Sequence, residues 1–252
     1  MKKILNICWF MLFLSMGLMA STRGDVQVIE ASENIRLLGQ KMAKDYLYYY
    51  KNPKKLYLKE DLENDIELIG KSILEISTIT KNRDSQNILD FLSYNKDEIK
   101  ALLKEEVSRE KSILMLDYGE SFLEGANSIA HEHAYALSGD EKMLMLIKKM
   151  EYLLERTTKY YVATELNLDK NNNLNNMNNS IDDIEKILVK INAYPYPKEL
   201  LKDIKKMNHV WGKHRDFLHK SHELSVSNLL LTSEMILAKI IKKIALYHKQ
   251  NN

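Results

Sequence analysis

The sequence predicts an all-α protein made of two tandem antiparallel four-helix bundles, and three observations favour this fold. Apolar residues recur at spacings of three and four almost throughout the 252 residues. Only three prolines and eight glycines interrupt this pattern. No segment combines strand-like alternation with turn dipeptides, so we expect no β-sheet.

Four helices are expected in the first half. The first covers about residues 25–50 and ends before Pro53, and the second covers about residues 61–80. A third begins after Asp84, a suitable N-cap, and a fourth continues to about residue 137. The second helix carries one stripe of apolar residues, which are Leu62, Ile66, Ile69, Ile73 and Ile76.

The second half begins at "SGDE", residues 138–141, whose spacing is that of a capping box. This helix continues to about residue 168. We expect the Asn-rich segment "DKNNNLNNMNNS", residues 169–180, to be a loop, because asparagine is a poor helix former. Without a helix there, residues 171–179 should be dispensable for folding.

Three more helices follow. One covers about residues 181–191 and ends at "AYPYP". The next should hold Pro197 in its first turn and reach about residue 220. The last covers about residues 221–248. Although residues 224–247 are rich in apolar side chains, four charged residues interrupt them, so we expect an amphipathic helix and no membrane span.

The two halves correspond to each other. "LLGQKMAKDYLYYY" aligns with "LLERTTKYYVATEL", "IELIGKSIL" with "IDDIEKIL", and "ESFLEGANSI" with "EMILAKIIKKI", at offsets of 116, 115 and 114 residues. We therefore expect one four-helix unit at residues 25–137 and a second, more divergent unit at residues 138–252. A long shared helix around residue 138 should join them.

The N-terminal segment "MKKILNICWFMLFLSMGLMA" has the parts of a secretory signal peptide, which are two lysines, an apolar run and small residues near Ala20. It predicts export to the periplasm. Leu18 is larger than the residue usually found at its position before a cleavage site, so an uncleaved anchor in the inner membrane is the alternative.

Composition excludes several classes of function. Cleavage after Ala20 would remove the single cysteine, Cys8, and with it disulfides, cysteine-ligated metals and a thiol nucleophile. It would also remove Lys2 and Lys3 and leave 35 basic and 35 acidic residues, so we expect no nucleic-acid partner. Phosphate-binding loops, nucleophile elbows and paired catalytic carboxylates are absent. The sequence predicts no enzyme and no cofactor.

Three segments resemble the N-terminal sensory domain of type IV pilus methyl-accepting chemotaxis transducers, the PilJ-type domain. "IRLLGQKMAK", residues 35–44, is similar to its helix-one signature. "WGKHRDF", residues 211–217, resembles its third helix, and "YGESFLEGANSIA", residues 118–130, its fourth. The resemblance implies a periplasmic four-helix sensor of small molecules that, in some relatives, recognises nitrate-like anions through the helix-one arginine.

The chain departs from this pattern in both units. In the first unit Glu33, Asn34 and Ile35 stand where a further arginine is usual. In the second, Tyr152 occupies the position of Arg36, and Arg156 that of Gln40. Ligand binding by the second unit is therefore not expected.

The predicted ligand-binding residues are Arg36, Gln40 and Asn34. A guanidinium offers paired donors to a trigonal anion or a carboxylate, and an amide one turn further adds another donor. The resemblance implies that two first helices meet at this patch in a homodimer. The alternative is structural, because Glu33 lies three residues before Arg36 and can neutralise it.

We expect the histidines and Trp211 to have structural roles. His219 and His222 are three residues apart and with Glu223 form the only conceivable metal site, but solvated or capping histidines are the simpler interpretation, and we predict no metal. Trp211 should anchor the core of the second unit.

Two functions remain. The first is a sensor-like binding module for a small anion or organic solute, which passes its signal to a separate membrane sensor or receptor. The second is a ligand-free helical adaptor that binds another protein. A pocket lined by Arg36 and Gln40 would favour the binding module, and an exposed Arg36 without converging polar groups the adaptor.

Overall fold

The all-α class is confirmed. The structure is a computed structural model that describes the backbone of residues 2–220 and 226–251, and the side chains of those residues from Arg23 onward. Within these ranges the chain forms helices and no strand. The elements are α1 (Lys2–Lys51), α2 (Leu56–Ile79), α3 (Arg83–Leu102), α4 (Arg109–Glu132), α5 (Gly139–Glu165), α6 (Lys170–Ala193), α7 (Lys198–His219) and α8 (Ser227–Gln250).

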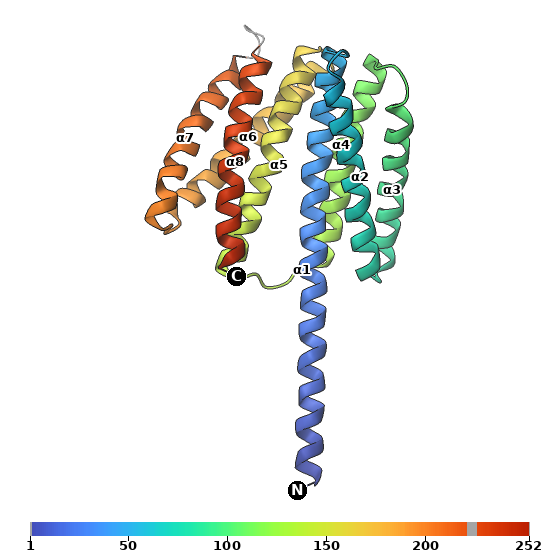
Figure 1. Cartoon of the computed structure of the whole chain (residues 1–252), viewed down its shortest axis with the longest axis vertical. Helices are drawn as coiled ribbons and strands as arrows, with labels where there is room; N and C mark the ends of the chain where they lie inside the picture. The colour runs from blue at the N-terminus through green and yellow to red at the C-terminus, as the bar shows by residue number, and fades with distance from the viewer. Residues whose placement is uncertain (1, 221–225, 252) are drawn as a thin grey trace.

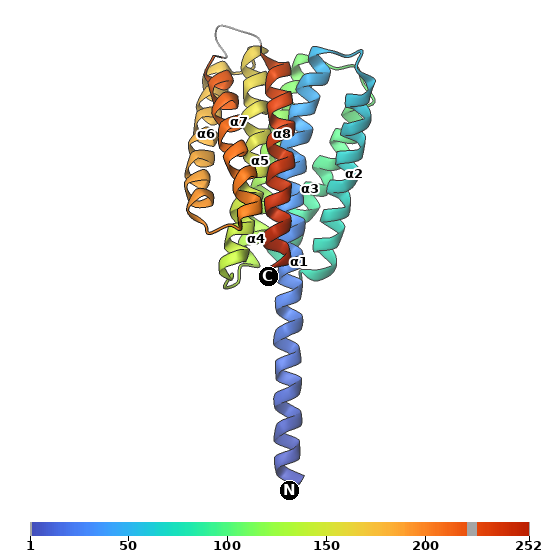
Figure 2. The same cartoon turned by 60° about the vertical axis from the view of Figure 1, so that its left-hand side comes forward.

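Helices α1 and α5 lie at the centre of the molecule and pack against each other. Helix α1 also contacts α2 and α4, and α3 contacts α2 and α4. Helix α5 contacts α6 and α8, and α7 contacts both of these. Figures 1 and 2 show α2 and α3 on one side of the central pair and α6 and α7 on the other. The N-terminal part of α1 extends away from the other helices (Figure 1).

Two hydrophobic clusters follow from this arrangement. One is formed by buried residues of α1 to α4, including Ile35 and Phe122. The other is formed mainly by α5 to α8 and also takes in Leu47 and Tyr48 of α1. The predicted stripe of α2 is buried along its whole length, and each fully buried aliphatic side chain contributes about 1.5–3 kcal/mol. The spacing of three and four thus identified the core face of α2.

Helix starts follow local capping chemistry. The capping box at Ser138 is confirmed, because its side chain accepts from the Glu141 backbone N–H and the Glu141 side chain accepts from the backbone N–H of Ser138. Helix α3 is capped by Asn82 and not after Asp84, since the Asn82 side chain accepts from the backbone N–H groups of Asp84 and Ser85. Pro197 is the N-cap of α7, one position before its first turn.

The prediction of a loop in the Asn-rich segment was wrong. Helix α6 begins at Lys170, and the connection to α5 is a short turn in which Asn167 and Asp169 adopt positive φ angles of 53° and 40°. Asparagine and aspartate tolerate this left-handed conformation. Buried Asn173 and Met177 extend the apolar face of the helix toward its N-terminus, so tertiary packing outweighs the low helix propensity of asparagine.

Other predicted boundaries need correction. Helix α2 begins at Leu56, five residues before the predicted start. Helix α4 ends at Glu132, and no helix runs through residues 133–138, so the expected shared helix is absent there. Its place is taken by an extended connection that ends at the Ser138 cap. The predicted start of the last helix lies in residues 221–225, outside the described residues.

From Arg23 onward, where side chains are described, no helix is long and apolar enough to cross a membrane. Helix α8 is amphipathic, as the sequence predicts. The predicted signal peptide, residues 1–20, lies outside the residues whose side chains are described, so its cleavage stays a prediction.

Candidate functional site

Arg36, Gln40 and Lys44 follow one another at intervals of four residues on α1, where this helix approaches α4 and α5. A helix places residues four apart on one face. A helix face that packs against neighbouring helices is usually apolar. This face of α1 instead carries a row of polar and charged side chains. The partners of these side chains come from distant parts of the chain.

Arg36 is paired inside the protein. Its Nη1 donates to Glu33 Oε1, and its Nη2 lies 3.4 Å from the carbonyl oxygen of Ala126 on α4. The side chains of Arg36 and Glu33 are only 13% and 7% exposed. Burial raises the pKa of Glu33 although Arg36 acts to lower it. The structural alternative for Arg36, pairing with Glu33, is therefore realised.

Gln40 is fully buried and uses both ends of its amide. Its Nε2 donates to the Gly119 carbonyl oxygen at 2.7 Å, and its Oε1 accepts from Lys159 Nζ at 2.7 Å. Gly119 lies on α4 and Lys159 on α5. Gln40 thus holds three helices together and does not face the same cavity as Arg36.

Asn34 lines a pocket of about 250 Å³ between α1, α5 and α8. The other lining residues are Glu30, Glu33, Leu144, Met145, Lys148, Lys242, Ala245, Leu246 and Lys249. We call this the seam pocket. Arg36 lines a different opening of about 360 Å³, together with Asn127, His131 and Met145, and Glu33 lines both. The structure therefore does not bring Arg36, Gln40 and Asn34 into one cavity.

Lys159, the partner of Gln40, belongs to a second charged group. Its Nζ forms an ion pair with Glu120 Oε1, and Arg156 Nη2 lies 2.7 Å from Glu120 Oε2. Burial would raise the pKa of Glu120, but the two cations lower it to about 2. Burial also lowers the pKa of Lys159 to about 8, because its ammonium is shielded from water and repelled by Arg156. The charged form of Glu120 is stabilised because it faces two cations, whereas burial destabilises the charged form of Lys159.

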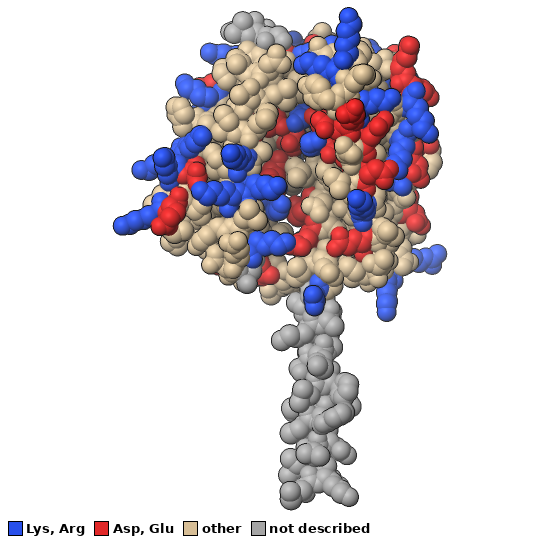
Figure 3. Space-filling model, viewed as in Figure 1, with Lys and Arg blue, Asp and Glu red and all other residues tan. Residues whose placement is uncertain are grey.

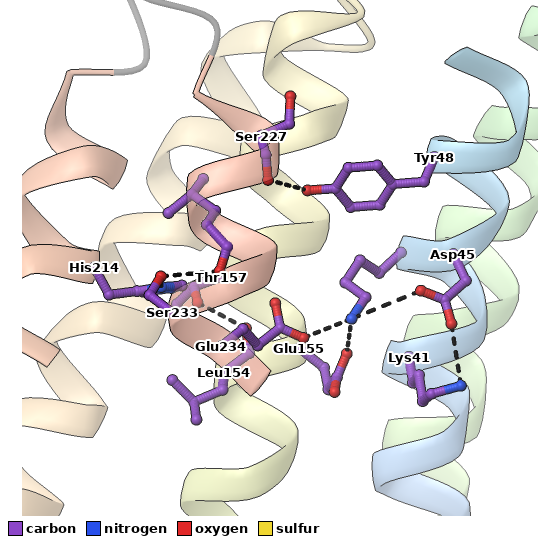
Figure 4. Close-up of polar contacts among 12 residues, drawn as sticks. Lys41, Asp45, Tyr48, Leu154, Glu155, Thr157, His214, Ser227, Ser233 and Glu234 are labelled. Atoms are coloured by element: carbon purple, nitrogen blue, oxygen red, sulfur yellow. Dashed lines mark hydrogen bonds and ion pairs between the residues drawn. The ribbon is translucent and has the colours of Figure 1, made fainter. Parts of the chain in front are cut away.

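Lys44 lies in a third charged group, between α1, α5 and α8. Its Nζ is 2.5 Å from Glu155 Oε2 and 2.5 Å from Glu234 Oε1, and all three side chains are almost completely shielded from water. Figure 4 shows Glu155 and Glu234 pointing from α5 and α8 toward the α1 side, where Asp45 lies. Burial raises the pKa of Glu155 well above its usual value. Burial also acts to raise the pKa of Glu234, but Lys44 lowers it below its usual value. Two carboxyl groups thus lie beside one ammonium group.

His131, His209 and His219 are exposed and His133 is the C-cap of α4, as the simpler interpretation of the sequence predicts, but two other histidines are buried. His214 is fully buried, with Nδ1 2.7 Å from Ser233 Oγ, and burial lowers its pKa to about 4. His248 is also buried and contacts Asp140 and Tyr196. Both rings sit on inward-facing positions of amphipathic helices. Trp211 is buried and stacks on His214, which confirms its place in the core.

The described residues contain no group of three His, Cys, Asp or Glu side chains arranged to hold a metal ion. His222 and Glu223, the expected partners of His219, lie outside the described residues. The absence of a metal site therefore stays a prediction for that segment.

Lys44, Glu155, Glu234 and Lys159 are the site residues that the sequence did not reveal. The available signal was their spacing, since Lys44 and Lys159 stand at positions where core residues are expected. Their partners could not be predicted, because Lys44 meets Glu234 across 190 residues of sequence. Chemically, these buried ion pairs fix the helices relative to one another, while the seam pocket offers room for a small solute.

Comparison with known proteins gave no match: the chain corresponds to no family model, no curated protein and no solved structure. The resemblance to the PilJ-type sensory domain thus depends on the residues quoted above alone.

Proposed function

We propose that the chain consists of two tandem antiparallel four-helix units, α1 to α4 and α5 to α8. The contacts support this division, since each set of four helices closes into a ring of neighbours. The two hydrophobic clusters follow nearly the same division. Four helices of this length enclosing one core make a normal bundle. In this proposal α1 and α5 are corresponding helices of the two units.

On this framework the chain is a sensor-like binding module that takes a small anion or organic solute in the seam pocket. The observation that carries this proposal is the combination of apolar and oppositely charged residues around a concave site. Such sites bind small molecules through apolar contact and a few polar groups that fix orientation. Because helices of both units line the pocket, a bound solute would contact both.

The remaining parts of the proposal follow from the sequence. The protein acts in the periplasm, either free or tethered by its N-terminal segment, and passes its signal to a separate membrane partner. A homodimer through the first helices would need a free face of α1. The face with Gln40 and Lys44 is covered by α5 of the same chain, so such a dimer would use another side of this helix.

Thermal denaturation of the full chain tests the binding proposal. Nitrate, nitrite, acetate and L-leucine are added separately, and at least one should raise the melting temperature. A solute at 100 times its Kd stabilises the folded state by about 2.7 kcal/mol, or about 5 to 10 °C for a chain of this size. Ala245→Trp, which fills the seam pocket, should remove the shift.

In the same assay, Arg36→Ala distinguishes binding in the seam pocket from binding in the opening lined by Arg36. If the solute binds in the seam pocket, the shift should persist in this variant. If the predicted anion clamp operates in the Arg36 opening, the shift should disappear in Arg36→Ala and persist in Ala245→Trp. Equal melting temperatures with and without every solute would contradict the binding module.

The second candidate is the ligand-free adaptor, and exposed aromatic residues favour it. Phe91 and Tyr94 are one turn apart on α3 and are 55% and 60% exposed. Exposed aromatic side chains are enriched at protein interfaces. If no solute binds, this face of α3 is the surface on which to search for a protein partner.

A further inference from the structure

The two halves of the chain carry net charges of opposite sign. Residues 25–137 contain 15 Lys and Arg residues against 21 Asp and Glu residues, whereas residues 138–252 contain 19 against 14. The charges nearly cancel over the whole chain but not within either half. Such a separation favours contacts in which the acidic half of one molecule meets the basic half of another.

The acidic half presents aromatic and acidic side chains together on the outer side of α3. Asp90, Tyr94 and Glu98 follow one another at intervals of four residues, and Phe91 lies beside them on the same side of the helix. All four residues are exposed, and the two carboxylates form no ion pair with any described residue. We call these four residues the α3 face.

The basic half carries a row of basic side chains on α7. Lys202, Lys206, His209 and Lys213 are spaced four, three and four residues apart, so they share one side of the helix, and all are exposed. The three lysines form no ion pair with any described residue. Figure 3 shows basic side chains gathered over the α7 and α8 side of the molecule.

Beside this row lies a groove of about 530 Å³ between α7 and α8, lined by Lys206 and Lys239 and by the 74% exposed Met235. The acid that lines it, Asp203, is already paired with Lys243. Methionine sulfur and lysine ammonium groups both interact favourably with aromatic rings. We call the row on α7 and this groove together the lysine groove.

We propose that copies of this chain associate head to tail, with the α3 face of one copy in the lysine groove of the next. A single helix at the edge of one molecule then lies between two helices of another, as in other helix-in-groove contacts. Phe91 and Tyr94 contact Met235 and the lysine stems, while the two carboxylates of the α3 face meet the ammonium groups. This inference is independent of solute binding.

The positions of the two surfaces determine the kind of assembly. Helices α3 and α7 lie on opposite sides of the molecule, so two copies cannot pair both surfaces with each other at once (Figures 1 and 2). A symmetric contact between two α3 faces would bring like charges together, which disfavours it. The contact is therefore heterologous, and its repetition gives a ring or an open chain.

Sedimentation velocity of the full chain tests this. At low salt the sedimentation coefficient should rise with protein concentration above the value of a monomer. It should return to the monomer value in about 1 M NaCl, where the screening length falls to about 3 Å.

Charge reversal assigns the two surfaces. The double variant Asp90→Lys, Glu98→Lys and the double variant Lys206→Glu, Lys213→Glu should each weaken association at least about tenfold, because each brings like charges together. All four substitutions in one chain should restore association, since the two surfaces are again complementary. The four positions are exposed, so the substitutions leave the core intact.

The double variant Lys170→Glu, Lys190→Glu is the matched control. It changes the net charge as much as Lys206→Glu, Lys213→Glu does, but at exposed positions on α6, and it should associate like the wild type. A wild type that stays monomeric at every concentration, equal weakening in the control, or no recovery in the fourfold variant would overturn the inference. Association that neither double variant weakens would place the contact on another surface, such as the first helices, and would also overturn it.

Discussion

At the scale of single residues, the unusual feature is charge inside the helix packing. Lys44 and Glu234 are buried, and the side chain of Glu155 is only 12% exposed. Removing charged groups from water costs several kcal/mol per ion, and the mutual attraction offsets this only while every partner is present. Such groups add little net stability but make the loss of one member expensive.

Lys44→Met should therefore destabilise the protein by about 3 to 5 kcal/mol at pH 7, because Glu155 and Glu234 are left without a cation. The triple variant Lys44→Met, Glu155→Leu, Glu234→Leu should recover most of this loss, since it removes all the buried charge. Urea denaturation measures both. A single variant as stable as the wild type would show that water reaches the cluster.

His214 should make stability depend on pH. Its pKa is lowered from 6.5 to about 4 in the folded state, first of all by burial. Between pH 6.5 and 4 the unfolded chain binds more protons than the folded protein, so stability falls as the pH is lowered through this range. The loss should reach about 3 kcal/mol at pH 4.

Comparison with His214→Asn isolates this effect in urea denaturation at pH 7 and pH 4. Other groups titrate in both proteins, so the wild type should lose about 3 kcal/mol more than the variant over this interval. Equal losses in both would mean that His214 is protonated in the folded protein.

At the scale of helices, periodicity predicted which segments are helical and which faces are buried. It failed at the Asn-rich segment, where propensity favoured a loop although Asn173 and Met177 continue the buried face of α6. It also could not reveal the partners of Gln40. Hydrogen bonds to Gly119 and Lys159 depend on how three helices meet, and no local sequence pattern encodes this. The presence of the helices was predictable from the sequence, whereas the contacts between them were not.

Met177→Ala should cost about 2 to 4 kcal/mol, because the side chain is 1% exposed and its removal leaves a cavity. Asn179→Ala, on the exposed face of the same helix, is the control and should stabilise slightly through higher helix propensity. Thermal unfolding compares the two. If Met177→Ala behaved like the control, the N-terminal part of α6 would not be packed as described.

Helices α1 and α4 approach closely at a glycine. A Cβ atom added to Gly39 would lie 2.7 Å from Phe122 Cβ, so Gly39→Ala should destabilise by about 1 to 3 kcal/mol despite its better helix propensity. A Cβ added to Gly212 in α7 meets no atom within 4 Å, so Gly212→Ala should stabilise by about 0.5 to 1 kcal/mol. The opposite signs distinguish close packing from propensity, and two changes of the same sign would contradict the α1–α4 contact.

At the scale of the whole molecule, polar contacts form part of the junction between the two sets of helices. Ion pairs and hydrogen bonds link α1 to α5 and α8 at Lys44, and Lys51 Nζ contacts Glu165 on α5 at 2.7 Å and Ser227 on α8 at 2.9 Å. Figure 3 shows basic side chains gathered over the α7 and α8 side, while both signs of charge are mixed elsewhere on this face. The contact between the two sets also has an apolar part, since Leu47 and Tyr48 of α1 belong to the hydrophobic cluster formed mainly by α5 to α8.

The seam pocket is lined by both sets of helices, since α1 belongs to one set and α5 and α8 to the other. A solute that binds one relative arrangement of the halves better than another would change their populations. In the proposed function, this change of populations is the step that links binding to the signal.

The most direct test of the account is a nuclear magnetic resonance titration of the ¹⁵N-labelled chain with nitrate, nitrite, acetate and L-leucine in turn. Saturable chemical-shift changes should be largest at the backbone amides of Asn34, Leu144 and Ala245, which lie on the three helices of the pocket. Spectra that do not change with any of these solutes, or changes confined to residues remote from α1, α5 and α8, would contradict it.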